Sequence, residues 1–164
     1  MTDLISEIKE SHFALTQRAL SFEIDGISVR AVPDLVLMFR DRPPSVIDWK
    51  VKAQSIQDFR NQLSIYALAI SRVAPHRDFP LSVMRGAPEN VKLIEVQLLA
   101  NLTRIHKLAI EDIADLENLI ALSSHEMLLA LGDGEPSSPE DFETTIYPDL
   151  CTRCNFRKLC WENG

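Results

Sequence analysis

Cysteine is absent from the first 150 residues, and no apolar run approaches the ~18–20 residues that a membrane-spanning helix requires. All three cysteines lie in the last 14 residues, a spacing that leaves little room for a disulfide framework. The N-terminal stretch is too acidic and too interrupted for a signal peptide. With 46% hydrophobic and 25% charged residues, the composition is that of an ordered globular protein. We therefore expect a cytoplasmic protein with no membrane partner.

Basic residues are scarce in one part of the chain. Residues 87–150 contain 3 Lys or Arg against 13 Asp or Glu, whereas residues 1–86 contain 11 against 10 and residues 151–164 contain 3 against 1. The net charge of −7 argues against a protein that coats nucleic acid in general. Because the acidity is confined to one segment, a phosphate-binding site in the first half, helped by the tail, remains compatible with the charge.

Hydrophobic periodicity predicts one mixed domain rather than a repeat or an all-helical bundle. The pattern indicates a helix over residues 3–20, a hairpin over 21–31, strands over 32–39 and 45–52, a helix over 55–73, a hairpin of 79–85 with 91–99, and one or two helices over 102–131. This order predicts an α/β or α+β fold, with a mixed central sheet flanked by helices. We expect a core domain of residues 1–146 and a cysteine knuckle, residues 147–164, packed on the same domain.

The strand "VIDWKVK" carries an acid and a base on one face, since side chains alternate along a strand and Asp48 and Lys50 are two residues apart. Asp34 begins the preceding strand, so a turn between the strands brings it to the same sheet edge. Two close carboxylates repel unless a cation lies between them, and hard oxygen ligands suit Mg²⁺ or Mn²⁺. The alternative is an ordinary surface ion pair without function.

The helix that follows adds two polar side chains. Gln62 and Tyr66 are four residues apart and project from one face of the helix. Taken alone, they are better explained by an ordinary amphipathic helix in which Tyr66 is half-buried.

The terminal sequence "CTRCNFRKLC" places Cys151, Cys154 and Cys160 at C-x2-C-x5-C spacing. Thiolates at such spacing select zinc or an iron–sulfur cluster. Three interpretations stay open: a 4Fe–4S cluster with a fourth ligand from elsewhere, a zinc site, or three metal-free thiols that pack as small apolar groups.

Together, the aspartates, "DWK", the Q-x3-Y pair and the cysteines resemble the RecB-like branch of the PD-(D/E)XK nucleases. The likeness is to its iron–sulfur members, which include CRISPR-associated adaptation nucleases and AddB-type nuclease domains. It covers about residues 23–160. It implies a restriction-endonuclease-like fold that hydrolyses DNA phosphodiesters with Mg²⁺ or Mn²⁺, at or from ends of single-stranded or unwound DNA, in DNA repair or CRISPR defence.

The resemblance also implies roles for individual residues. Asp34, Asp48 and the backbone carbonyl of Trp49 would hold the metal, Lys50 would be the catalytic lysine, and Gln62 with Tyr66 would complete the site. The cysteines would bind a 4Fe–4S cluster.

The chain departs from the family pattern in its N-terminal part. The family has an upstream His or Glu as a further metal ligand, for which the candidates here are Glu7, Glu10 and especially His12. It also has a fourth cysteine near the N-terminus, which this sequence lacks. We expect that these pieces come from a missing N-terminal segment or a partner chain. The alternative functions are a catalytically degenerate nuclease-fold module that binds DNA or a protein, and a small zinc-knuckle interaction protein.

Overall fold

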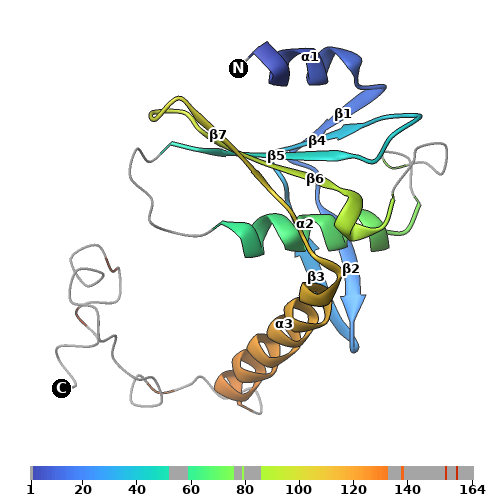
Figure 1. The fold of residues 1–164 in the computed structure, drawn as a ribbon. Helices are drawn as coiled ribbons and strands as arrows, with labels where there is room; N and C mark the ends of the chain where they lie inside the picture. The colour runs from blue at the N-terminus through green and yellow to red at the C-terminus, as the bar shows by residue number, and fades with distance from the viewer. Residues whose placement is uncertain are drawn as a thin grey trace. The chain divides into compact units, whose positions relative to one another are not determined.

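The fold is that of a computed structural model (Figure 1), which describes residues 2–51, 59–75, 79, 86–132, 138, 154 and 158. The chain divides into two compact units, Met1–Ala121 and Leu122–Gly164. Among the described residues, no helix has the length and apolar character needed to cross a membrane. The first unit contains every strand described below.

A five-stranded mixed sheet forms the centre of the first unit. Its strands are β1 (Phe13–Thr16), β4 (Leu35–Met38), β5 (Ser45–Lys50), β6 (Lys92–Gln97) and β7 (Leu102–His106). The strand order is β1-β4-β5-β6-β7, in which only β5 and β6 run parallel. This arrangement confirms the mixed central sheet that the sequence predicts.

A separate two-stranded hairpin consists of β2 (Leu20–Ile24) and β3 (Ile27–Ala31). Its turn residues, Asp25 and Gly26, have φ values of 49° and 78°, as a tight two-residue turn requires. The inward-facing residues of β2 are buried against the main core, so the hairpin is an extension of that core and not a free arm.

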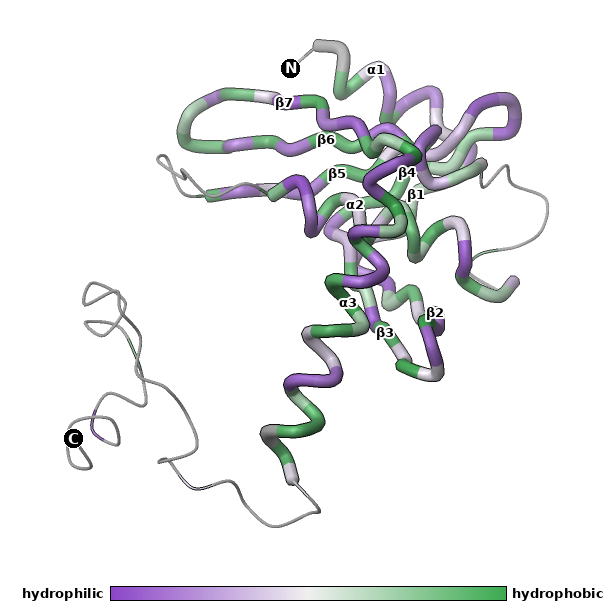
Figure 2. The backbone as a smooth tube through the Cα atoms, turned by 60° about the horizontal axis from the view of Figure 1, so that its bottom comes forward, coloured by the Kyte–Doolittle hydropathy of each residue, from purple (hydrophilic) through white to green (hydrophobic). Residues whose placement is uncertain are grey.

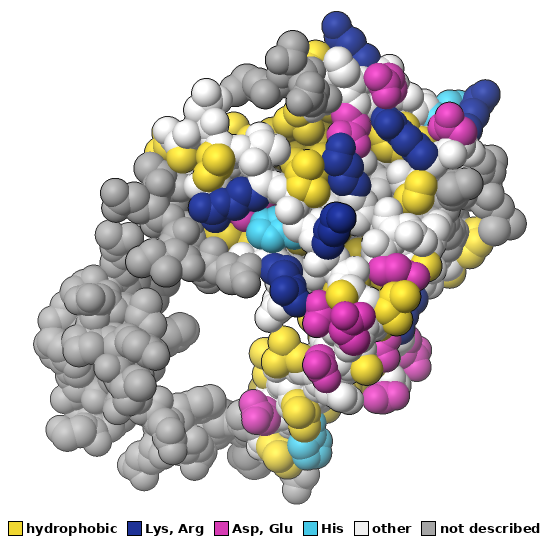
Figure 3. All heavy atoms as spheres, in the orientation of Figure 1, with side chains coloured by type: hydrophobic (Ala, Val, Ile, Leu, Met, Phe, Trp, Pro, Cys, Tyr) yellow, Lys and Arg dark blue, Asp and Glu magenta, His cyan; other side chains and the backbone are white. Residues whose placement is uncertain are grey.

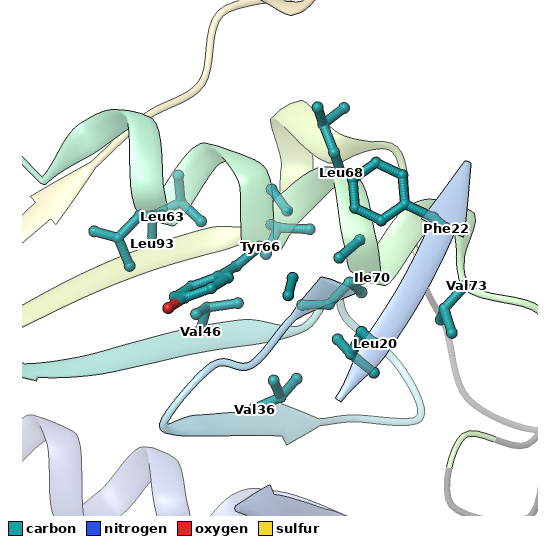
Figure 4. Packing of buried hydrophobic residues seen from close by; sticks show 14 of the residues in the cluster. Leu20, Phe22, Val36, Val46, Leu63, Tyr66, Leu68, Ile70, Val73 and Leu93 are labelled. Atoms are coloured by element: carbon teal, nitrogen blue, oxygen red, sulfur yellow. The ribbon is translucent and has the colours of Figure 1, made fainter. Parts of the chain in front are cut away.

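Helices cover the two faces of the sheet. Figure 1 shows α1 (Thr2–Glu10) on one side and α2 (Arg60–Arg72) on the other. Leu4 of α1 packs with Leu37 and Ile47 on the first face. On the second face, α2 packs on alternate residues of the strands, as the close view of Leu63, Tyr66, Val46 and Leu93 shows (Figure 4).

A third helix, α3 (Ile110–Leu131), begins in the first unit and ends in the second. Hydrophobic and hydrophilic stretches alternate along it (Figure 2). Acidic side chains gather on it (Figure 3), among them Glu111 and Asp112 in its first turn, where the helix dipole favours negative charge. The acidic segment of the sequence is therefore partly a helix surface.

Three sequence predictions about elements are wrong. The helix predicted over residues 3–20 ends at Glu10, because Phe13–Thr16 pairs with β4 and tertiary pairing outweighs helical spacing. The helix predicted from residue 102 begins at Ile110, since 102–106 form an edge strand. Both edges of β6 are filled by β5 and β7, so it does not pair with residues 79–85 as predicted. Of those residues, 80–85 lie outside the described part of the chain.

A buried carboxylate joins α1 to the sheet. Glu7 is 8% exposed, accepts a hydrogen bond from Ser45 Oγ, and lies 2.6 Å from Lys92 Nζ. Burial by itself raises the pKa of Glu7, but the hydrogen bonds and charge of Lys92 and Ser45 outweigh it and leave the pKa below its ordinary value of 4.5. The charged form is thus favoured in the folded protein.

Replacing Glu7 by glutamine is expected to lower the free energy of unfolding at pH 7 by about 1–2 kcal/mol. This is the contribution of one charge-assisted hydrogen bond to stability, lowered because solvent screens the half-exposed Lys92. Because the folded pKa is depressed, the wild-type advantage is complete above pH ~5 and disappears as pH falls through that depressed pKa. Urea unfolding of the wild type and of Glu7→Gln from pH 3 to 7 measures this difference in stability.

The matched control is Glu10→Gln on the same helix, since Glu10 pairs with Arg42 and both side chains are exposed. This change should alter stability by less than about 0.5 kcal/mol. Equal losses in the two variants would contradict a specific role for the buried carboxylate.

Candidate active site

The turn between β4 and β5 brings two aspartates together. Asp34 directly precedes β4, and Asp48 lies within β5, whose Ile47 pairs with Leu35. Asp34 Oδ2 accepts a hydrogen bond of 2.9 Å from the backbone N–H of Trp49. The first aspartate is therefore fixed to the strand that carries the second, beside it.

Lys50 and Gln62 complete a network around Asp48. Lys50 Nζ forms an ion pair with Asp48 Oδ2, donates a 2.9 Å hydrogen bond to Gln62 Oε1, and lies 4.1 Å from the centre of the Phe59 ring. The other end of Gln62 donates to Tyr66 Oη at 2.6 Å and more weakly to Asp48 Oδ1 at 3.4 Å. One amide thus connects the lysine, the aspartate and the tyrosine.

The position of Gln62 and Tyr66 follows from the buried face of α2. Leu63, Ala67 and Ile70 are fully buried and fix the rotation of the helix over the sheet. Since residues four apart share a face, Gln62 and Tyr66 then point toward β5. Figure 4 shows the Tyr66 ring lying beside Val46, which belongs to the same face of β5 as Asp48.

Burial dominates the electrostatics of the cluster. Asp48 is 3% exposed, and burial raises its pKa above the ordinary 3.8, although the bound Lys50 opposes the shift. The neighbouring charges of Asp34 and Glu95 raise it further. Burial also raises the pKa of Tyr66, so its hydroxyl stays protonated at neutral pH.

Two carboxylates of the cluster have the chemistry that a divalent cation requires. Asp48 Oδ2 is buried and paired with the ammonium of Lys50, so a cation bound there would share or replace that contact. A second carboxylate, Asp34, stands beside it, and carboxylate oxygens are the ligands that Mg²⁺ and Mn²⁺ prefer. Within the described ranges there is no group of three or more His, Cys, Asp or Glu side chains that could hold an ion. Asp34 and Asp48 are the two carboxylates of the cluster that could hold an ion, and their role as ligands, like that of the Trp49 carbonyl, stays a prediction.

The upstream candidates lie elsewhere. The backbone N–H of His12 bonds to Met38 O at the far end of β4, about 13 Å along the strand from Asp34, and its Nε2 lies 3.2 Å from Arg40 Nη2. Glu7 bonds to Ser45, which faces the opposite side of β5 from Asp48. The structure brings neither residue to the cluster.

Sequence inspection missed a second polar group on the same sheet face. In the parallel pairing, Glu95 of β6 lies directly opposite Asp48, and Arg104 of β7 lies opposite Glu95. Glu95 is 1% exposed, yet its carboxylate contacts Gln97 Nε2 at 2.6 Å and His106 Nε2 at 2.8 Å. The sequence did contain a signal for this polar group, because the strand "KLIEVQ" carries Glu95 and Gln97 on one face of an otherwise apolar run.

The predicted cysteine site lies almost wholly outside the described residues. Cys151 and Cys160 are among those not described, whereas Cys154 is exposed and forms no disulfide with any described residue. The metal interpretation of this segment therefore stays a prediction.

Comparisons with known proteins agree with this fold. A family model described as the PD-(D/E)XK nuclease superfamily matches residues 1–161. Among solved structures, the crystal structure of SSO0001 matches with a TM-score of 0.50 and 16% identity, covering 97% of this chain and 65% of that one. This chain therefore spans less than two thirds of that protein, and the likeness at this identity concerns the fold. A search of curated proteins gave no match. Because the family match covers nearly the whole chain, the protein belongs to the PD-(D/E)XK nuclease superfamily.

Proposed function

We propose that this protein is a Mg²⁺- or Mn²⁺-dependent deoxyribonuclease that hydrolyses phosphodiester bonds at or near ends of single-stranded or unwound DNA. Members of the superfamily are in general hydrolytic nucleases. The observation that carries the proposal is the buried Asp48, with Asp34, Lys50 and Gln62 converging on it. Two aspartates, a lysine and an amide gathered around one buried carboxylate with a shifted pKa are typical of a catalytic site.

Each side chain has a distinct part in this proposal. Asp34 and Asp48 would hold the cation, which, when bound, polarises a phosphoryl oxygen and makes water more acidic. Lys50, held by Gln62 and the Phe59 ring, lies where its ammonium can orient the attacking water or stabilise negative charge developing on the phosphate. Tyr66 keeps its proton and supports Gln62 from behind.

The test is a cleavage assay on end-labelled single-stranded, double-stranded and circular single-stranded DNA with Mg²⁺, Mn²⁺ or EDTA. Metal-dependent shortening of the linear single strand, with the circle intact, is the expected result. Cutting of the circle would keep the nuclease and reject the preference for ends. No cleavage of any substrate by folded protein would reject the enzyme.

A specific observation favours a second candidate, a nuclease-fold module that binds DNA or a protein without cutting. Lys50 already neutralises Asp48, and among the described side chains no set of three carboxylates or imidazoles is arranged to hold an ion. DNA binding without cleavage, unchanged by EDTA, is what this candidate predicts.

A 4Fe–4S cluster bound by Cys151, Cys154 and Cys160 is part of the proposal and is supported by their spacing in the sequence. Iron and sulfide analysis of anaerobically purified protein tests it. Stoichiometric zinc would instead indicate a zinc knuckle.

Gln62→Ala and Tyr66→Phe are expected to reduce the cleavage rate by about 10–100-fold, less than changes at Asp48 or Lys50. Both residues act by orienting groups that contact the ion or the phosphate, and such partners have effects of this size. Single-turnover rates under saturating Mn²⁺ measure the effect. The matched control is Ser71→Ala on α2, since Ser71 bonds only to its own helix at Leu68 O. A Tyr66→Phe protein with no measurable activity would show that Tyr66 contacts the reacting groups directly.

A further inference from the structure

Glu95 has no part in the mechanism above, although burying its carboxylate carries a large desolvation cost. It is 1% exposed and lies between Asp48 on β5 and Arg104 on β7 in one row across the sheet. Its charge raises the pKa of Asp48. A carboxylate that is this expensive to bury needs an explanation in its other contacts.

Those contacts lead to the edge strand. One carboxylate oxygen of Glu95, Oε2, is held by His106 Nε2 at 2.8 Å, and the other, Oε1, by Gln97 Nε2 at 2.6 Å. Arg104 Nη1 approaches Oε1 at 3.7 Å, too far for a hydrogen bond. The carboxylate is therefore fixed in orientation, and it attracts the guanidinium of Arg104 without accepting a hydrogen bond from it.

Arg104 also differs from the other cations near the cluster. Lys50 is committed to Asp48 and Gln62, while on α2 Arg60 pairs with Asp112 and Arg72 with Glu117. The Arg104 side chain is 46% exposed, and its guanidinium makes no hydrogen bond to Glu95. An exposed planar guanidinium is well suited to a phosphate.

We propose that Arg104, positioned by the Glu95–His106 pair, binds a backbone phosphate of the nucleic-acid strand next to the phosphate held at Asp48. Two strand spacings, about 10 Å, separate the backbones of Arg104 and Asp48, so the bound phosphate belongs to a neighbouring nucleotide. Contacts of this kind position a strand without reading its sequence. The inference rests on the proposed nucleic-acid substrate.

The experiment measures binding of fluorescent oligothymidylate by anisotropy at several salt concentrations, in the Asp48→Asn background so that DNA stays intact. Arg104→Gln should weaken binding about tenfold and reduce the slope of log K against log salt by roughly 0.7, the value for one phosphate on a single strand. The matched control is Arg42→Gln, whose side chain is 44% exposed and lies in the turn that leads to the start of β5. It should change affinity less than twofold.

The Glu95→Gln variant tests whether Glu95 acts by positioning Arg104 or only by its negative charge near the DNA. Removing a negative charge near a phosphate should tighten binding by electrostatics alone, whereas loss of the anchor for Arg104 should weaken it. We expect weaker binding by about threefold to tenfold, and thermal unfolding shows whether this variant folds. If it does not fold, the surface variant Arg104→Gln decides the result.

An unchanged affinity and salt slope for Arg104→Gln would overturn the inference, even in a protein that cleaves DNA. Equal losses for Arg104→Gln and Arg42→Gln would overturn it too, since general charge would then suffice. Conversely, the expected Arg104 effect in a wild-type protein that does not cleave would keep the phosphate site and reject the nuclease.

Discussion

The Asp48→Asn variant should lose DNA cleavage by at least about 10²–10⁴-fold while staying folded. An asparagine has nearly the same shape but offers one neutral oxygen, so it cannot hold a divalent cation between β4 and β5 as a carboxylate can. The variant should also bind Mn²⁺ poorly. Thermal unfolding measures this binding without relying on cleavage. An ion present at a concentration of 100 times its Kd raises the free energy of unfolding by about 2.7 kcal/mol. Mn²⁺ should raise the Tm of the wild type and leave that of the variant unchanged.

The raised pKa of Asp48 adds a dependence on pH. Because burial favours the protonated form, the charged carboxylate appears only as pH rises through this raised value, and cleavage should increase over the same range. The same shift means that the stability contributed by protonated Asp48 is complete below the ordinary pKa of an aspartate and is lost as pH rises through the raised value of the folded protein. An amide does not ionise, so Asp48→Asn should escape this loss. Cleavage rates and Tm values from pH 4 to 8 test both statements.

The control for this variant is Asp41→Asn, in the exposed turn between the same two strands. It makes the same change of charge and should leave both cleavage and the Mn²⁺ effect intact. If Asp48→Asn cleaved DNA at the wild-type rate, Asp48 would have no role in catalysis and the proposed site would be wrong.

Lys50→Ala should abolish cleavage to a similar extent, about 10²–10⁴-fold, but have the opposite effect on metal binding. The ammonium of Lys50 contacts Asp48 Oδ2, one of the carboxylate oxygens that would hold a cation in the proposed site. Removing it leaves the carboxylates of Asp34, Asp48 and Glu95 without this counter-charge. The variant should therefore bind Mn²⁺ at least as tightly as the wild type and still fail to cut.

Thermal unfolding with and without Mn²⁺, together with single-turnover cleavage, separates the two roles. Lys107→Ala is the control, since Lys107 is exposed and follows β7. Loss of Mn²⁺ binding in Lys50→Ala would show that the lysine supports the ion and does not act on the phosphate. Retained cleavage would remove Lys50 from the mechanism.

Local patterns in the sequence were sufficient for part of the site. Alternation along β5 placed Asp48 and Lys50 on one face, and the four-residue spacing on α2 placed Gln62 and Tyr66 together. Asp34 could be added because a short turn joins antiparallel strands that are adjacent in sequence. These relations depend on strand and helix periods, which a sequence shows directly.

Pairing over long distances decided the rest. Glu95 lies opposite Asp48 because β5 and β6 are parallel, and their register is set by α2 and the residues between them, not by any local pattern. The edge strand β7 was mistaken for the start of a helix, so Arg104 and His106 were not considered. Residues 13–16 are a strand for the same reason, because β4 offers a free edge that outweighs helical spacing.

The sequence by itself therefore determined the fold class, the superfamily pattern and the cluster of Asp34, Asp48, Lys50, Gln62 and Tyr66, since all of these follow from elements close in the chain. Only the tertiary structure decided that Glu7 and His12 lie away from that cluster and that Glu95 connects it to Arg104. The physical reason is that a strand's face follows from its own sequence, whereas its neighbours in a sheet depend on which distant segments bury their apolar sides together.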